Sequence, residues 1–215
     1  MSEARPPESF AFTPENLKRA AAIIAKYPEG SQASAVLALL DLAQRQNAGW
    51  LPRPALDCVA DFLKMPRIRV YEVATFYSML NLRPVGRHHV QVCTSLPCWL
   101  RGSDAIVAAC RDALGIGFGE TTADGGFTLS EVECLCACVN APVVQIGDDY
   151  YEDLDPDRLR AVLGALKLGK APKAGPQIGR TGGEPMGGLT TLTDEAAVLA
   201  PKWRKDDPRS GGAGC

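Results

Sequence analysis

Histidine is almost missing from this sequence, with only His88 and His89 in 215 residues. This scarcity nearly excludes zinc sites built on histidine and leaves little room for an enzyme that relies on a Ser–His or Cys–His pair. Both histidines lie in a short segment with strand character, where adjacent side chains point to opposite faces of a sheet. We therefore do not expect the two imidazoles to bind one metal together.

An excess of basic residues and long apolar runs are also lacking. The 23 Lys and Arg residues are balanced by 25 Asp and Glu residues, and the formal net charge is -2. This charge supplies no basic field for a nucleic-acid backbone or an anionic membrane surface, so we expect no nucleic-acid partner. No apolar run approaches the roughly 20 residues of a membrane-spanning helix, and no direct membrane insertion is expected. The first ten residues, MSEARPPESF, lack the features of a secretory signal, which favours a cytoplasmic protein.

Cysteine, in contrast, is abundant, with eight residues in the chain. Without a secretory signal, metal binding or redox chemistry explains so many thiols better than a set of disulfides does. Four of the cysteines form the pattern Cys93-x4-Cys98, a gap of 35 residues, and Cys134-x3-Cys138. The other four are Cys58, Cys110, Cys136 and Cys215.

Residues 1–9 are expected to be disordered. The sequence that follows, up to residue 84, predicts a domain made of short helices. A first helix is predicted to begin at Thr13, a suitable N-cap, with Pro14 in the first helical position. A second helix is expected to end near 47–49, and a third to span about 53–64. The residues expected on the apolar stripe of a fourth helix are Val73, Phe76, Tyr77 and Leu80. Residues 10–84 are assigned to this helical domain.

Residues 85–169 predict a second domain that mixes strands and helices. The elements expected there are a strand over 88–92, a helix from about Pro97 to Leu114, a strand over 127–132, a hairpin over 142–151 and a helix from Asp155 to near Gly169. The order β-α-β-β-α resembles a thioredoxin-like α/β half-barrel. The fold class predicted for the whole chain is therefore α+β.

From Lys170 onward proline and glycine dominate, which predicts an extended tail over 170–215. This segment has few residues that could form a core of its own. We expect it to lie along the surface of another protein.

Each cysteine pair falls where a predicted strand gives way to a loop, Cys93 after 88–92 and Cys134 after 127–132. Two loops at the same end of a sheet can bring four thiolates together, and an iron–sulfur cluster needs such a set of soft ligands. Ser95 and Pro97 also predict a helix start beside the first pair, with Ser95 as its cap, and a helix start favours nearby negative charge. The pattern thus favours an iron–sulfur site on Cys93, Cys98, Cys134 and Cys138.

Other uses of these thiols stay open at this point. Structural zinc also takes four thiolates, although the x4 and x3 spacings are wider than those of common zinc knuckles. A zinc-stabilised adaptor without a redox role is therefore an alternative. A thiol–disulfide oxidoreductase needs a C-x-x-C pair at a helix start, and the sequence offers x4 there, so this alternative ranks last.

The remaining cysteines have simpler interpretations. Cys58 and Cys110 fall on apolar helix faces and are expected to be small core residues. Cys215 ends a glycine-rich tail and is expected to be an exposed thiol without a role. Cys136 lies between two proposed ligands, where it could pack, lie close to the cluster or replace a ligand.

Two stretches of the sequence resemble the halves of a known cluster motif, VCTSLPCWLRG at 92–102 and EVECLCACVNAP at 131–142. Together with RVYEVATFY at 69–77 and YYEDL at 150–154, they are similar to the 24 kDa subunit family of respiratory complex I, the NADH–quinone oxidoreductase of bacteria. The resemblance runs from about residue 10 to residue 192. Several motifs lie in the order found in the family, so the resemblance is specific.

The resemblance implies a thioredoxin-like [2Fe–2S] ferredoxin domain behind a helical domain, with one cluster on Cys93, Cys98, Cys134 and Cys138. It implies an oxidoreductase subunit without catalysis of its own, exchanging single electrons with FMN. The expected partners are a larger flavin subunit, which binds FMN, NADH and a [4Fe–4S] cluster, and the adjacent large Fe–S subunit. The expected location is peripheral, in the hydrophilic arm on the cytoplasmic side of a bacterial inner membrane.

One residue departs from the family pattern, and one segment separates this family from its relatives. Cys136 stands where the family usually has glycine, a residue that tolerates a positive φ better than cysteine does. Related subunits occur in NAD-linked formate dehydrogenases and NAD-reducing hydrogenases, but these often lack the tail. Gly179-Arg180 and EPMGGLTTL at 184–192 resemble the tail of the complex I members, which favours that enzyme.

Overall fold

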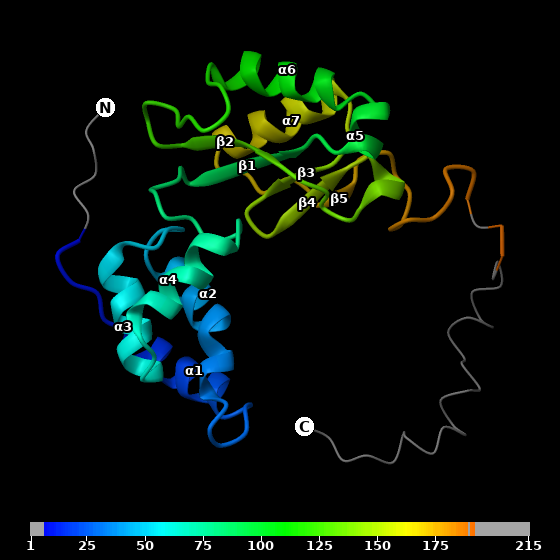
Figure 1. Cartoon of the computed structure of the whole chain (residues 1–215). Helices are drawn as coiled ribbons and strands as arrows, with labels where there is room; N and C mark the ends of the chain where they lie inside the picture. Colours follow the sequence, from blue (N-terminus) through cyan, green and yellow to red (C-terminus); the bar gives the residue numbers. More distant parts are fainter. Residues whose placement is uncertain (1–6, 189, 192–215) are drawn as a thin grey trace.

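Four α-helices form the first part of the chain and pack around one apolar core (Figure 1). The computed structural model describes residues 7–188 and 190–191. The helices of this part are α1 (Pro14–Ile24), α2 (Val36–Gln46), α3 (Arg53–Leu63) and α4 (Arg67–Phe76), with a 3₁₀ turn, η1 (Gln32–Ala35), before α2. Leu39, Leu40 and Val59 are fully buried between them. Of the segment 1–9, for which disorder is expected, residues 1–6 lie outside the described residues.

The start of α1 agrees with the sequence pattern, whereas the end of α4 does not. The Thr13 hydroxyl accepts a hydrogen bond from the Asn16 N–H at 3.3 Å, and Pro14 occupies the first turn, so the predicted cap is confirmed. The stripe predicted for α4 is wrong at its C-terminal end, because the helix stops at Phe76 and the backbone of Tyr77 is extended. Phe76 is therefore 78% exposed, and α4 buries Val70 and Ala74 instead.

The second part contains a five-stranded sheet in the order β2-β1-β3-β4-β5 within the described residues. The strands are β1 (His88–Cys93), β2 (Phe127–Val132), β3 (Val144–Ile146), β4 (Asp149–Glu152) and β5 (Gly175–Pro176). β1 is parallel to β2 and antiparallel to β3, β3 and β4 form the predicted hairpin, and β4 is parallel to β5. A parallel pair needs a crossover connection, which the helices between β1 and β2 supply.

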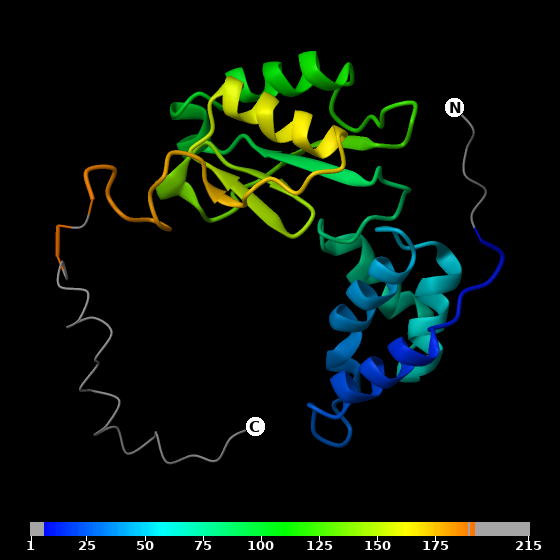
Figure 2. The ribbon, with the colours of Figure 1, turned by 180° about the vertical axis from the view of Figure 1, so that it is seen from behind.

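Helices α6 (Ser103–Leu114) and α7 (Pro156–Lys167) lie side by side over one face of this sheet (Figures 1 and 2). Their apolar faces and the strands enclose the second core, which includes Val90, Ile106, Leu129 and Leu159. The single helix predicted from Pro97 to Leu114 is wrong. Gly102 adopts φ +93°, which an α-helix does not contain and glycine tolerates best, so the segment divides into α5 (Leu96–Leu100) and α6.

The described part of the tail returns to the domain it leaves. Gly175 and Pro176 of β5 pair with Tyr151 and Glu152 of β4, so the sheet extends beyond the expected boundary at residue 169. The expectation that the tail lies on another protein is therefore wrong for this stretch, because β4 offers it an open edge to pair with. Residues 189 and 192–215 lie outside the described residues.

The helical part and the sheet are joined by a forked ion pair. Arg45 of α2 donates from Nη1 and Nη2 to the Asp148 carboxylate at the β3–β4 turn, at 2.7 and 2.9 Å. Its Nε also donates to Asp41 at 2.9 Å. The guanidinium lowers the pKa of Asp148 through the hydrogen bonds that it donates to that carboxylate.

Among the helices of the described residues, none has the length and apolar character needed to cross a bilayer.

Candidate metal centre

The carboxyl ends of β1 and β2 lie next to each other and carry the two cysteine loops. The strands are parallel and pair Cys93 with Val132, so Cys134 follows only two residues beyond that contact. The Thr94 N–H donates to the Val132 carbonyl at 3.4 Å, and the Thr94 hydroxyl donates to Glu131 at 2.6 Å. The expectation that both loops lie at one end of the sheet is confirmed.

The first pair of thiols is buried. Cys93 ends β1, and its N–H donates to the Val143 carbonyl at 3.2 Å, while Cys98 lies in the short helix α5. Both side chains are 2% exposed and pack with Ala141 and Val143. Burial, followed by a hydrogen bond with the Cys93 thiol, raises the pKa of Cys98 to about 12.

Ser95 begins α5, but its side chain does not cap the helix. The hydroxyl donates to the Glu133 carboxylate at 3.3 Å instead. The expectation that Ser95 caps this helix is therefore wrong at the level of the side chain. Its hydrogen bond joins the first cysteine loop to the second.

The second pair of thiols is close together and exposed. The Sγ atoms of Cys134 and Cys138 lie 3.3 Å apart. The backbone N–H of Cys136 donates to Cys134 Sγ at 3.3 Å, and this bond is the main reason that the pKa of Cys134 is lowered. The hydrogen bond with Cys134 raises the pKa of Cys138.

Cys136 contributes to this loop through its backbone. It adopts φ +62°, a left-handed conformation that glycine tolerates better than other residues do. This conformation directs its N–H to Cys134 Sγ, whereas its thiol lies 3.8 Å from the Cys134 carbonyl oxygen. The close thiol–thiol contact of this loop thus joins Cys134 with Cys138.

The donor set fits a two-iron cluster in its chemistry. Such a cluster takes four thiolates, two on each iron, and the four predicted cysteines lie as two pairs on adjoining loops. Within residues 7–188 and 190–191, no three His, Cys, Asp or Glu side chains gather around one point as ligands of a single ion do. The backbone donor to Cys134 Sγ would stabilise the thiolate form that a metal needs.

The histidines and two further cysteines are used elsewhere. His89 Nε2 lies 2.8 Å from the Ser130 hydroxyl, and the His88 ring lies against the Phe127 ring with their centroids 5.1 Å apart. Cys110 is fully buried in the sheet–helix core, and Cys58 is half-buried against the helical core, as expected. Cys215 lies outside the described residues.

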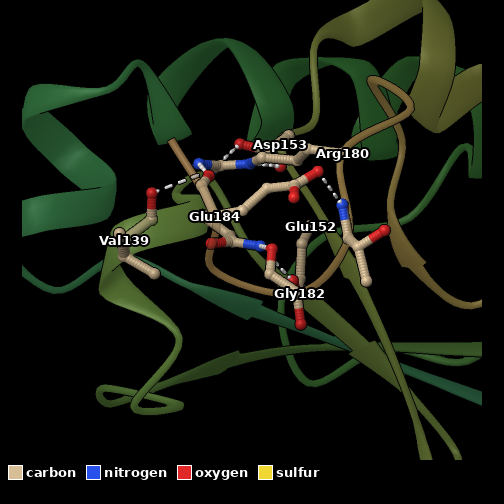
Figure 3. A network of polar contacts seen from close by, with 8 residues as sticks. Val139, Glu152, Asp153, Arg180, Gly182 and Glu184 are labelled. Carbon is tan, nitrogen blue, oxygen red and sulfur yellow. Dashed lines mark hydrogen bonds and ion pairs between the residues drawn. The ribbon is translucent and has the colours of Figure 1, made fainter. Parts of the chain in front are cut away.

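The sequence pattern did not reveal that Tyr150 and the Arg180–Asp153 pair lie beside the thiols. Tyr150 packs against the apolar cluster around Cys93, where burial and then the neighbouring thiols raise its pKa. Arg180 forms a buried ion pair with Asp153 directly beyond the second cysteine loop (Figure 3). Arg180 belongs to the tail segment that resembles the complex I members, but its partner Asp153 could not have been named from the sequence.

Apolar side chains are exposed on the surface next to the thiols. Leu96, Trp99 and Leu100 of α5 are 64%, 54% and 68% exposed, and Val139 beyond Cys138 is 68% exposed. Each of these side chains lies within two residues of Cys98 or Cys138, and large exposed apolar groups next to a site are typical of a contact surface.

Comparisons with known proteins agree with this geometry. The thioredoxin-like [2Fe–2S] ferredoxin family matches residues 20–167. One of the NADH-quinone oxidoreductase subunits of Rickettsia bellii (strain RML369-C) is 59% identical over 159 residues, which are 74% of this chain and 95% of that protein. The mitochondrial NADH dehydrogenase [ubiquinone] flavoprotein 2 of Dictyostelium discoideum is 50% identical over 197 residues, 92% of this chain and 79% of that protein.

Solved structures with a similar fold include a hydrogenase. A chain of the NAD⁺-reducing [NiFe]-hydrogenase in the air-oxidized state is similar with a TM-score of 0.54 and 21% sequence identity. The likeness covers 63% of this chain and only 23% of the hydrogenase chain. At this identity the comparison describes the architecture alone.

Proposed function

Starting from the fact that this chain belongs to the thioredoxin-like [2Fe–2S] ferredoxin family, we propose that it is the electron-transfer subunit of an NADH–quinone oxidoreductase. We propose that Cys93, Cys98, Cys134 and Cys138 hold one [2Fe–2S] cluster. Such a cluster, when bound, supplies reversible transfer of one electron. The observation that carries the proposal is the meeting of two thiol pairs at the adjoining ends of two parallel strands.

The protein environment of the thiols suits this role. The first pair is shielded from water by Ala141 and Val143, which lowers the local dielectric around Cys93 and Cys98. The second pair is exposed and receives the Cys136 N–H on Cys134 Sγ. A hydrogen bond to a ligand sulfur stabilises negative charge, so this donor favours the reduced state.

The exposed side of the site is proposed to face the partner that delivers electrons. Leu96, Trp99, Leu100 and Val139 present an apolar surface beside the thiols. The partner proposed for this surface is a flavin subunit that binds FMN and NADH, so that this chain binds neither. The adjacent large Fe–S subunit is a second proposed neighbour. The assembly is proposed to lie on the cytoplasmic side of a bacterial inner membrane, without insertion of this chain.

The domain organisation proposed with this function has a helical domain over 10–84 and a cluster domain that begins at 85. The stretch 175–188 is included in the cluster domain, since β5 pairs with β4 and Arg180 contacts Asp153.

An anaerobic EPR spectrum of the reduced full chain tests the proposal, with iron and zinc counted on the same sample. A rhombic spin-half signal with about two irons per chain is expected. Cys138→Ala is expected to abolish the signal, whereas Cys110→Ala, which alters a core thiol, is expected to keep it. A colourless protein with about one zinc per chain would contradict the proposal and favour a structural adaptor.

A further inference from the structure

A buried arginine of the tail reaches across to the backbone that follows Cys138 (Figure 3). The side chains of Arg180 and Asp153 are only 8% and 5% exposed. Arg180 donates from Nε to Asp153 Oδ2 at 2.8 Å and from Nη2 to Oδ1 at 2.5 Å. A forked, buried pair of this kind has one well-defined geometry.

The remaining donors of Arg180 hold two backbone carbonyls. Nη2 donates to the Val139 carbonyl at 2.9 Å, and Nη1 donates to the Glu184 carbonyl at 2.8 Å. One guanidinium thus joins the end of β4, the tail and the 3₁₀ turn η2 (Cys138–Asn140). The first residue of that turn is the proposed ligand Cys138.

Asn140 attaches the same turn to the tail and to β4. Its Nδ2 donates to Glu152 Oε2 at 2.6 Å and to the Gly182 carbonyl at 2.8 Å. Its own carbonyl accepts from the Asp153 N–H at 2.7 Å. The two residues that follow Cys138 are therefore each tied to the tail.

The tail also lies directly against the turn at Gly183. A Cβ added to Gly183 would lie 3.2 Å from Val139 Cγ1. Within the tail, the Thr181 N–H donates to Glu184 Oε1 at 2.6 Å and fixes the loop that carries the Glu184 carbonyl. The segment 180–184 is thus a strap over the turn, which we call the tail strap.

We propose that Arg180 is a positioning residue that acts through the tail strap to hold Cys138 in its place beside Cys134. This inference rests on the proposed function, in which Cys138 is a cluster ligand. Groups that orient a metal ligand tune the affinity and the potential of the site without touching the metal. The stretch 138–140 is short and has no regular partner strand, so contacts from outside must fix it.

Only arginine can serve all these acceptors. Its planar guanidinium presents five donors in a rigid fork, and four hydrogen bonds to three residues are used here. Lysine keeps the charge but cannot match the fork. Arg180→Lys therefore separates the charge of the residue from its geometry.

The experiment compares Arg180→Lys and Arg180→Gln with wild type and with Arg160→Gln in the full chain. Arg160 pairs with Asp157 on the exposed face of α7 and serves as the matched control. The readouts are the EPR g values, the midpoint potential and the rate of cluster loss to a chelator, with the unfolding midpoint measured on the same samples. We expect both Arg180 variants to shift the g values and potential and to lose the cluster about tenfold faster or more, with Arg180→Gln the stronger.

A second readout needs no cluster. In the metal-free chain, oxidised glutathione converts the Cys134 and Cys138 thiols to a disulfide and is itself reduced to two molecules of glutathione. Because wild type holds the two Sγ atoms 3.3 Å apart, the Arg180 variants are expected to form this disulfide more slowly.

The outcomes separate the two claims. If Arg180→Gln keeps the g values, the midpoint potential and the disulfide rate of wild type, the positioning role is overturned, even if the unfolding midpoint falls. Arg180 would then only attach the tail to the domain. A wild-type chain that binds no iron would overturn the proposed function. The disulfide rates would then still decide whether Arg180 positions Cys138.

Discussion

Cys136 offers the sharpest test of how the second cysteine loop works, because its backbone and its thiol can be changed separately. At φ +62° a non-glycine residue bears a cost of roughly 1–2 kcal/mol, which glycine removes. Glycine loses more chain entropy on folding, roughly 0.5–1 kcal/mol. The strain relieved is the larger of the two, so Cys136→Gly is expected to raise the free energy of unfolding by about 1 kcal/mol or less.

Both Cys136→Gly and Cys136→Ala remove the thiol but keep the N–H that donates to Cys134 Sγ. Both are therefore expected to retain about two irons per chain and the EPR signal of wild type, as judged by metal analysis and anaerobic spectroscopy. Only Cys136→Ala keeps the strained conformation, so it is expected to be the less stable of the two in urea unfolding.

The pattern of losses decides between the possible roles. If both variants lose iron while Cys138→Ala keeps it, the thiol of Cys136 is a ligand and the assignment of Cys138 is wrong. If Cys136→Gly alone loses iron, the loop needs the restricted backbone of a non-glycine residue at position 136. This result would refute the expectation that glycine suits this position.

Two further predictions concern groups away from the thiol loops. Arg45→Ala removes the ion pair with Asp148, whose partners are 52% and 73% exposed, so the loss of unfolding free energy is expected to be about 1 kcal/mol or less and smaller at high salt. Because the folded-state pKa of Asp148 is lowered, this difference from wild type should be present above about pH 4 and disappear as the pH falls further; a difference that grows in acid would contradict the pair. Burial raises the pKa of Cys110 to about 12, so its thiol should resist iodoacetamide at neutral pH until the chain is unfolded; rapid labelling of the folded chain, followed by mass spectrometry, would contradict its burial.

Several elements could be predicted because their signals are local. The strand Phe127–Val132 has the predicted bounds, and the cap at Thr13 was visible in the residue order Thr-Pro-Glu. The break between α5 and α6 was missed because a lone glycine in a helical pattern gives no sign of its φ, and Gly102 is at +93°. The exposure of Phe76 was missed because it depends on where α4 stops.

That the two cysteine loops meet could be predicted from the sequence, whereas the residues that support them could not. The four cysteines could be named from their places after two strands, and the parallel pairing of Cys93 with Val132 brings their loops together. The strand at Gly175–Pro176 has no strand propensity of its own and forms because β4 offers an open edge. The pairing of Arg180 with Asp153 spans 27 residues and arises from tertiary structure, which a single sequence does not reveal.

The parallel pairing of β1 and β2 also bears on the order in which the chain matures. Parallel strands join only after the helical crossover between them has closed, and contacts so distant in sequence form slowly. We therefore expect the second thiol pair to reach the first late in folding. On the proposed function, a chain that ends before β2 would present only Cys93 and Cys98 to the system that delivers iron and sulfide.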